Sequence, residues 1–250
     1  MSPQGFGREY RRRGRLSQDG GIGVIKGATY WGGDIMAKLK IYGTPTSPPT
    51  RVARVAAHEF GHDFELVQMA WRVTPDELFE LNPGGRVPTL VHGDVTIWDS
   101  RQIWAYIEAL PDSKPHKFLR PLDGPHRWRE SNAVTLAYEM MSGTMVVRGM
   151  AEDPPIEDHP YLERNLARRD HALRALDEMS AEGWMVDPKT FGLAEAVMIC
   201  GTDALVGREV IDIHDYPYLA GIRMRYETRK SLADTKGEYY PGQRGGMPAP

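Results

Sequence analysis

The stretch from Asn82 to Ser100, with the sequence NPGGRVPTLVHGDVTIWDS, constrains the fold more than any other part of the chain. Val87-Pro88 leads into a short apolar strand over 89–91, and an X-Pro bond at such a point is a candidate cis bond. A cis bond would leave the main-chain N–H and C=O of Val87 free to pair with an extended peptide at a sheet edge. His92-Gly93 supplies turn chemistry and Val95 to Trp98 returns as a second strand. The stretch therefore predicts a hairpin beside a peptide-docking position.

A helix is predicted to begin directly after this hairpin. Asp99-Ser100 precedes the apolar positions Ile103, Ile107 and Leu110, which recur at helical spacing. The first N–H groups of a helix favour a negative charge. A free α-carboxylate would be held there by the Ser100 hydroxyl and main-chain N–H groups, while Asp99 could meet an α-ammonium.

The same residues resemble a known family. NPGGRVP followed by IWDS is similar to the glutathione-binding half of glutathione transferases, and the similarity extends from Lys38 to about Leu110. The resemblance implies that Val87, before the cis-proline Pro88, pairs with the cysteinyl backbone of glutathione. It also implies that Asp99 and Ser100 hold the γ-glutamyl group. Taken singly, Pro88 could be an ordinary strand-initiating proline, and Asp99-Ser100 a plain helix cap.

The flanking sequence predicts an α/β domain of thioredoxin-like order, βαβαββα, over residues 37–112. A strand ending at Gly43, a loop over 44–49, a helix that stops at Gly61 and a second strand over 64–67 form a βαβ unit. Its strands should be parallel. A short helical link over 71–81 leads to the hairpin.

The rest of the chain predicts an all-α helical bundle. The proline-rich residues 113–125 are expected to form a linker, followed by a helical domain over 126–235. Its expected helices span 128–150, 161–179, 191–206 and 215–229. Residues 236–250 are expected to be a loose tail, and 1–36, rich in Gly and Arg, a disordered extension. Translation beginning at Met36 is the preferred interpretation of that extension.

Two positions in the second half depart from the family pattern. Gly192-Leu193-Ala194-Glu195 stands where glutathione transferases usually carry S-x-A-D at the start of a buried helix, so the hydroxyl is lost and the acid kept. Gly still caps a helix, at a cost of a few tenths of a kcal/mol relative to Ser. Tyr216-Pro217-Tyr218-Leu219 resembles the family's Y-P-x-L, but Ile222 replaces a common Trp.

Ser47 is the candidate catalytic residue. It precedes Pro48 at a predicted helix start, where its hydroxyl could donate to a glutathione sulfur. A hydrogen bond to a charged group contributes about 1.5–3 kcal/mol, which corresponds to about one to two pKa units of the thiol. S-P-x-x-R is similar to the family's serine-type loop. Thr44 and Thr46 are rivals, and Ser47 could also be only a helix cap.

Conjugation of glutathione to small hydrophobic electrophiles is the favoured reaction. The loop has no cysteine, which disfavours disulfide exchange. Dehalogenation, ether cleavage and peroxide reduction stay open, and so does a non-catalytic binding module. Arg86 or Arg72 could hold the glycyl carboxylate. Cys200 is expected to be a buried, inert thiol. The walls of the acceptor site are expected to include Tyr138, Met141 and Met145.

A competing motif lies in the first helix. His58-Glu59-Phe60-Gly61-His62 matches H-E-x-x-H, in which two histidines on one helical face bind zinc and the Glu is the general base. Glu65 and Gln68 replace the Gly and the last His of the extended motif. A zinc metalloprotease is therefore kept only as a remote alternative, and no metal site is predicted.

Composition limits the cellular setting and the partners. The net charge is −3, and beyond Met36 there are 25 basic and 31 acidic residues, so nucleic acid is an unfavoured partner. One cysteine excludes an intramolecular disulfide framework, and no apolar run reaches the roughly 20 residues that span a bilayer. A cytoplasmic protein without a membrane partner is expected. The family resemblance also implies that the protein forms a homodimer.

Overall fold

The computed structural model of the 250-residue chain describes residues 37–69, 76–114, 124–150, 159–189 and 191–239. The expected extension over 1–36 and the candidate cation Arg72 lie outside these residues. So do 115–123 of the expected linker and 240–250 of the expected tail.

The N-terminal half is built on a four-stranded mixed sheet with the order β2-β1-β3-β4. The strands are β1 (Leu39–Gly43), β2 (Phe64–Gln68), β3 (Thr89–His92) and β4 (Val95–Trp98). β1 and β2 are parallel, whereas β3 is antiparallel to both β1 and β4. The predicted βαβ unit and hairpin are confirmed, and the thioredoxin-like order with them.

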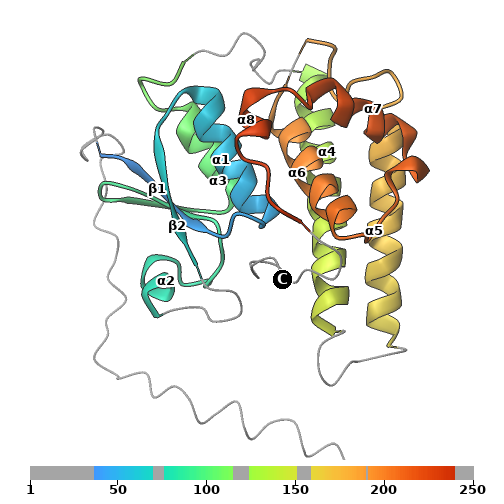
Figure 1. Cartoon of the computed structure of the whole chain (residues 1–250), viewed down its shortest axis with the longest axis horizontal. Helices are drawn as coiled ribbons and strands as arrows, with labels where there is room; N and C mark the ends of the chain where they lie inside the picture. Colours follow the sequence, from blue (N-terminus) through green and yellow to red (C-terminus); the bar gives the residue numbers. More distant parts are fainter. Residues whose placement is uncertain (1–36, 70–75, 115–123, 151–158, 190, 240–250) are drawn as a thin grey trace, which may run out of the picture.

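Helices cover both sides of this sheet. α1 (Pro48–Phe60) and α3 (Ser100–Glu108) lie on the side that faces the helical half, and α2 (Asp76–Leu81) lies on the other side (Figure 1). α1 ends as predicted, because Gly61 adopts φ 80° and its N–H bonds the carbonyls of Ala57 and His58. Val52, Ala56 and their apolar neighbours on α1 are fully buried. α1 is therefore a shared wall between the sheet and the helices that follow.

The C-terminal half is helical. Its main elements are α4 (Gly124–Met150), α5 (Pro160–Met179), α6 (Leu193–Gly207) and α7 (Pro217–Tyr226), with a 3₁₀ turn at Ile213–Asp215 and a short α8 (Lys230–Ala233). α6 is buried between α1 and α4 (Figure 1). Among the described helices, none combines the length and the apolar composition that crossing a bilayer requires.

The helix expected over 215–229 forms, but it is shorter than predicted. Pro217 opens α7, which ends at Tyr226, and Arg229 has an extended main chain, with φ −65° and ψ 121°, before α8 begins. The physical reason is a long-range contact, because Arg229 leaves the helical path to bind Glu59 of α1. The hydrophobic periodicity over 215–229 could not indicate that Arg229 binds Glu59.

The start of α6 has the register expected from the sequence. The Glu195 carboxylate accepts a hydrogen bond from the main-chain N–H of Gly192 at 2.9 Å, and Glu195 is fully buried. The acid therefore fixes the helix start from inside, as the third residue of a capping box does, without a hydroxyl at the capping position.

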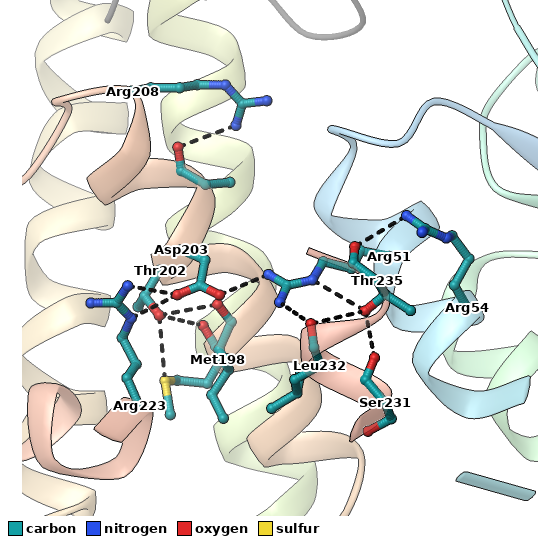
Figure 2. A network of polar contacts seen from close by, with 12 residues as sticks. Arg51, Arg54, Met198, Thr202, Asp203, Arg208, Arg223, Ser231, Leu232 and Thr235 are labelled. Carbon is teal, nitrogen blue, oxygen red and sulfur yellow. Dashed lines mark hydrogen bonds and ion pairs between the residues drawn. The ribbon is translucent and has the colours of Figure 1, made fainter. Parts of the chain in front are cut away.

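A buried polar network joins the two halves. The Arg51 guanidinium of α1 pairs with Asp203 of α6 at 2.8 Å and donates to the Leu232 carbonyl at 3.0 Å. Asp203 also accepts from Arg223 at 2.6 Å, so one carboxylate bridges two arginines (Figure 2). Arg51 is only 1% exposed, and a charge buried to that degree requires such partners. The Arg of the S-P-x-x-R pattern therefore joins the two halves.

A second ion pair makes the first testable prediction. Arg229 donates to both oxygens of Glu59, at 2.6 and 2.7 Å, and the Glu59 side chain is 3% exposed. Glu59→Ala leaves Arg229 without its carboxylate, so we expect the free energy of unfolding to fall by about 3 kcal/mol. Urea denaturation followed by circular dichroism measures the loss.

The control for Glu59→Ala is Lys230→Ala. Lys230 pairs with Asp234 on the surface, and its side chain is 85% exposed. Its removal should therefore leave the midpoint of urea unfolding unchanged. Equal midpoints for both variants would contradict the stabilising role given to Glu59.

Candidate functional site

One row across the sheet brings the predicted site residues to the same end. Tyr42 of β1 pairs with Thr89 of β3, and Thr89 pairs with Trp98 of β4. β1 and β4 run in one direction and β3 in the other. The loop after β1, the residues before β3 and the residues after β4 therefore leave the sheet together. These are the segments that carry Ser47, Val87-Pro88 and Asp99-Ser100.

Asn82 holds the loop that precedes β3. It is 4% exposed, and its amide nitrogen donates to the Arg86 carbonyl at 2.8 Å and to the Thr89 hydroxyl oxygen at 3.0 Å. Its amide oxygen accepts from the N–H of Gly84 at 2.9 Å. The Asn of NPGGRVP thus organises the approach to Val87.

The Val87-Pro88 bond is cis, as predicted. Pro88 is buried and Val87 is half-buried. The ladder between β3 and β1 runs from Thr89 to Val91, so the main chain of Val87 lies outside it. Its role as the docking position for a peptide stays a prediction.

Asp99 begins α3 in a constrained conformation. Its main chain has φ 69° and ψ 130°, and its carboxylate accepts from the N–H of Arg101 at 2.9 Å. A residue with a side chain at such angles carries a cost of about 1–3 kcal/mol that surrounding contacts must offset. The Arg101 side chain supplies two of these contacts, from Nε at 2.9 Å and Nη2 at 2.7 Å. Asp99 is therefore both the helix cap and one half of a bidentate ion pair.

The Asp99 carboxylate is held in its ionised form. Partial burial would raise its pKa, but hydrogen bonds from the Arg101 side chain and main chain outweigh burial, and the pKa is lowered. The start of α3 therefore presents a fixed pair of opposite charges, Asp99 and Arg101, at the end of the sheet where Ser47 and Val87 also lie.

Ser100 contacts the helical half directly. It is 1% exposed, and its hydroxyl is hydrogen-bonded to the hydroxyl of Tyr138 on α4. The Arg101 guanidinium lies 4.8 Å from the centre of the Tyr138 ring, a cation–π contact. Burial raises the pKa of Tyr138 to about 12, so this phenol keeps its proton. Tyr138 thus joins the candidate γ-glutamyl site to α4.

Ser47 begins α1. Its hydroxyl oxygen accepts from the N–H of Thr50 at 3.4 Å, and its own N–H donates to the Thr44 carbonyl at 3.2 Å. Ser47 is partly exposed, whereas its rivals Thr44 and Thr46 are each 7% exposed. An oxygen that accepts from Thr50 still has a proton to donate. Of the three hydroxyls, Ser47 is the most open and lies at the positive end of α1.

For the remaining predicted site residues that the structure describes, it gives the exposure of each side chain. Arg86 is exposed on the loop before Val87, so its contact with a glycyl carboxylate stays a prediction. Met141 is buried at 7% exposure and Met145 is 61% exposed, both on α4. Their role as acceptor-site walls also stays a prediction.

The HEFGH run does not form the zinc motif. α1 ends at Phe60 and Gly61 adopts φ 80°, so His62 lies beyond the helix and does not share a helical face with His58. His62 instead contacts the Ser113 hydroxyl at 2.7 Å, and Glu59 is bound by Arg229. Within the described ranges, no three His, Cys, Asp or Glu side chains are placed to hold a metal ion. The metalloprotease interpretation is therefore wrong.

Sequence reasoning missed Arg101, and it gave Tyr138 a different role. The DSR triplet contained a local signal, because a cation two residues after a capping Asp can reach back to its carboxylate. Tyr138, 38 residues from Ser100, offers no such signal, and only the packing of α4 against α3 brings the two hydroxyls together.

A four-stranded mixed sheet with a cis-proline before its third strand, followed by a helical half, defines a thioredoxin-like domain joined to a helical domain. Residues 41–115 match the family model described as "Glutathione S-transferase, N-terminal domain". This match assigns residues 41–115 to the N-terminal domain of the glutathione S-transferase family, and the relatives and structures that follow are similar to the chain over a longer range.

Relatives from plants support the same assignment. The chain is 46% identical to glutathione S-transferase 3 of Zea mays over 78 residues, which cover 29% of the chain and 34% of that relative. It is 26% identical to a zeta-class glutathione S-transferase of Euphorbia esula over 197 residues, or 76% of the chain and 85% of the relative. The higher identity thus spans about a third of the relative it matches, and the longer alignment is more divergent.

Solved structures agree over a longer range. A glutathione S-transferase from Methylobacillus flagellatus, crystallised with glutathione bound, matches with a TM-score of 0.69 and 27% identity, covering 82% of this chain and 100% of that one. A glutathione transferase family member from Pseudomonas fluorescens, also with bound glutathione, matches with a TM-score of 0.66 and 26% identity over the same shares.

Cys200 provides a test of the site description. It lies on α6 with no exposure, and burial raises the pKa of its thiol to about 12. Only the thiolate is reactive. We expect no labelling of the native protein by a chromogenic disulfide reagent at pH 8, and one equivalent after unfolding in guanidinium. Rapid labelling of the native state would show that α6 opens or that Cys200 is accessible.

Proposed function

We propose that the protein is a glutathione transferase that activates the glutathione thiol for nucleophilic attack on small hydrophobic electrophiles. The observation that carries the proposal is the row Tyr42–Thr89–Trp98, which gathers a helix-start hydroxyl, a cis-proline and a charged helix start at one end of the sheet. An extended tripeptide that lies across this end would meet all three. The glutathione bound in the two related structures supports this choice of ligand.

The γ-glutamyl end of glutathione matches the start of α3. This end carries an α-carboxylate and an α-ammonium on one carbon, so it is complementary to an adjacent anion and cation. Asp99 would take the ammonium, and Ser100, with the first N–H groups of α3, would take the carboxylate. Arg101 already pairs with Asp99 and could turn to the same carboxylate. The cysteinyl main chain would pair with Val87, and Arg86 would face the glycyl carboxylate.

Ser47 would supply the activation. A free thiol with a pKa near 8.5 is only a few per cent thiolate at neutral pH. A donated hydrogen bond from Ser47, aided by the dipole of α1, stabilises the anion by about 1.5–3 kcal/mol. The thiolate then attacks the electrophilic carbon, a carbon–sulfur bond forms, and a leaving group departs or the electrons move onto the acceptor. The acceptor would lie between the sheet and α4.

The composition favours a cytoplasmic setting, and the family resemblance implies a homodimer. A second candidate function is a non-catalytic binding module that retains the fold and binds glutathione. Isothermal calorimetry with glutathione, followed by conjugation of a chlorodinitrobenzene, separates the two. Binding with turnover supports the transferase and binding without turnover over a panel of electrophiles supports the module. No binding at millimolar glutathione contradicts both.

Replacing Ser47 by Ala tests the catalytic hydroxyl. We expect kcat/KM for conjugation to fall about tenfold to a hundredfold, because about 1.5–3 kcal/mol of thiolate stabilisation is lost. Glutathione affinity should change little. The pH at which the rate is half-maximal should rise by about one to two units, since the folded enzyme then requires more alkaline solution to form the thiolate.

Thr44→Val and Thr46→Val are the matched comparisons for Ser47→Ala. Each removes one rival hydroxyl with little change of volume, and each should leave the pH profile in place. A shifted profile in either threonine variant, with a normal one in Ser47→Ala, would transfer the catalytic role to that threonine.

Asp99→Asn tests the γ-glutamyl subsite. Asn preserves the helix cap but removes the charge that would meet the α-ammonium. We expect the Kd for glutathione to rise about tenfold, or about 1.4 kcal/mol, with kcat nearly unchanged at saturation. Asp94→Asn is the control, because Asp94 is exposed at the hairpin turn, at the opposite end of the same strands. Equal effects of both variants would argue for a general loss of negative charge.

A further inference from the structure

The peptide group between Thr46 and Ser47 is held at both of its polar ends. Its N–H, which belongs to Ser47, donates to the Thr44 carbonyl at 3.2 Å. Its C=O, which belongs to Thr46, accepts from Nη2 of Arg208 at 2.8 Å. Because a peptide group is planar, fixing both ends fixes the plane and with it the direction from which the Ser47 side chain leaves. Arg208 acts on this plane from the far end of α6.

Arg208 is itself held in place. It follows the last residue of α6, is 9% exposed, and donates to the Ala204 carbonyl at 3.3 Å. Its guanidinium lies 4.8 Å from the ring centre of Tyr239. Tyr239 packs against the helix end so closely that a Cβ at Gly207 would lie 2.5 Å from the Tyr239 Cβ. The arginine therefore lies between the Thr46 carbonyl and an aromatic ring.

The segment that carries Tyr239 also lies against the loop. Arg54 of α1 donates to the Thr235 carbonyl at 3.1 Å (Figure 2). Gly237 then passes so close to the loop that a Cβ there would lie 3.1 Å from the Pro45 carbonyl oxygen and 3.0 Å from the Tyr239 hydroxyl. Residues 236–239, expected from the sequence to belong to a loose tail, include the buried Gly237 and the partly buried Tyr239.

We propose that Arg208 and Tyr239 are positioning residues that aim the Ser47 hydroxyl at the glutathione sulfur. The inference rests on the proposed function, because it assigns a purpose to the direction of that hydroxyl. A charged, buried donor is suited to the task, since such hydrogen bonds are stronger than neutral ones and restrict the acceptor more. Displacing a reacting group by about 1 Å can lower a rate about a hundredfold.

Arg208→Met is the principal test. Met keeps an unbranched side chain of similar reach and removes the donors to Thr46. We expect glutathione to bind with a Kd within about threefold of the wild type, and the pKa of its bound thiol, followed by the ultraviolet absorbance of the thiolate, to rise by about one unit. kcat should fall about tenfold with little change in KM. Hydrogen exchange of the Ser47 amide, measured by nuclear magnetic resonance without glutathione, should accelerate about tenfold.

The control is Arg225→Met. Arg225 is an exposed arginine that also donates to two carbonyls, those of Gly183 at 2.8 Å and Pro188 at 2.6 Å, both within the helical half. Its replacement should leave the bound-thiol pKa and the Ser47 exchange rate unchanged. A general loss of packing would change the thiol pKa and the Ser47 exchange rate in both variants. A positioning role changes them only in Arg208→Met.

Tyr239→Leu covers the case in which Arg208→Met does not fold. It removes the ring beside the guanidinium but leaves Arg208 in place, and it should change the same two quantities in the same direction, by a smaller amount. A folded Arg208→Met or Tyr239→Leu with wild-type thiol pKa and wild-type Ser47 exchange overturns the inference. If the wild type binds no glutathione, the proposed function fails, and the amide exchange still decides whether Arg208 holds the loop.

Discussion

Tyr42, Thr89 and Trp98 form one row across three strands, and that register brings the segments carrying Ser47, Val87 and Asp99 to one end of the sheet. Shifting a strand by one residue would turn each of its side chains to the other face of the sheet. The apolar positions on β1 and β3, such as Ile41 and Leu90, are fully buried, so the register is fixed by the core. The site is thus assembled by burial of residues that take no part in its chemistry.

The two halves of the chain meet through charge as well as through apolar surface. Arg51 with Asp203, and Glu59 with Arg229, place four ionised groups from α1, α6 and the α7–α8 region in a largely buried boundary. Buried ion pairs often contribute little net stability, because desolvation opposes their attraction. They do penalise any arrangement in which one partner is left unpaired. This boundary therefore favours one mutual position of α1 and the helical half, and Ser47 lies at the start of that same α1.

Local sequence patterns predicted most of the framework. Three features depend on contacts within a few residues, and the sequence predicted each of them. They are the end of α1 at Gly61, the cis bond at Pro88 and Glu195 inside the start of α6. The HEFGH run left a zinc site open as a remote alternative, because five residues cannot reveal that Glu59 is bound by a residue 170 positions away. Arg208 lies 162 positions from Thr46, and no periodicity connects them. What the sequence could not supply was contact between distant segments.

The placement of Arg208 and Tyr239 also orders events during synthesis. A ribosome delivers the strands and α1 well before it delivers positions 208 and 239. Domains generally fold as they emerge, so the sheet can form while most of the helical half is still untranslated. The nascent chain at that stage contains Ser47 and the cis-proline but has nothing to hold the Thr46 carbonyl. The geometry proposed for Ser47 is therefore complete only after residues 208 and 239, far along the chain, have been made.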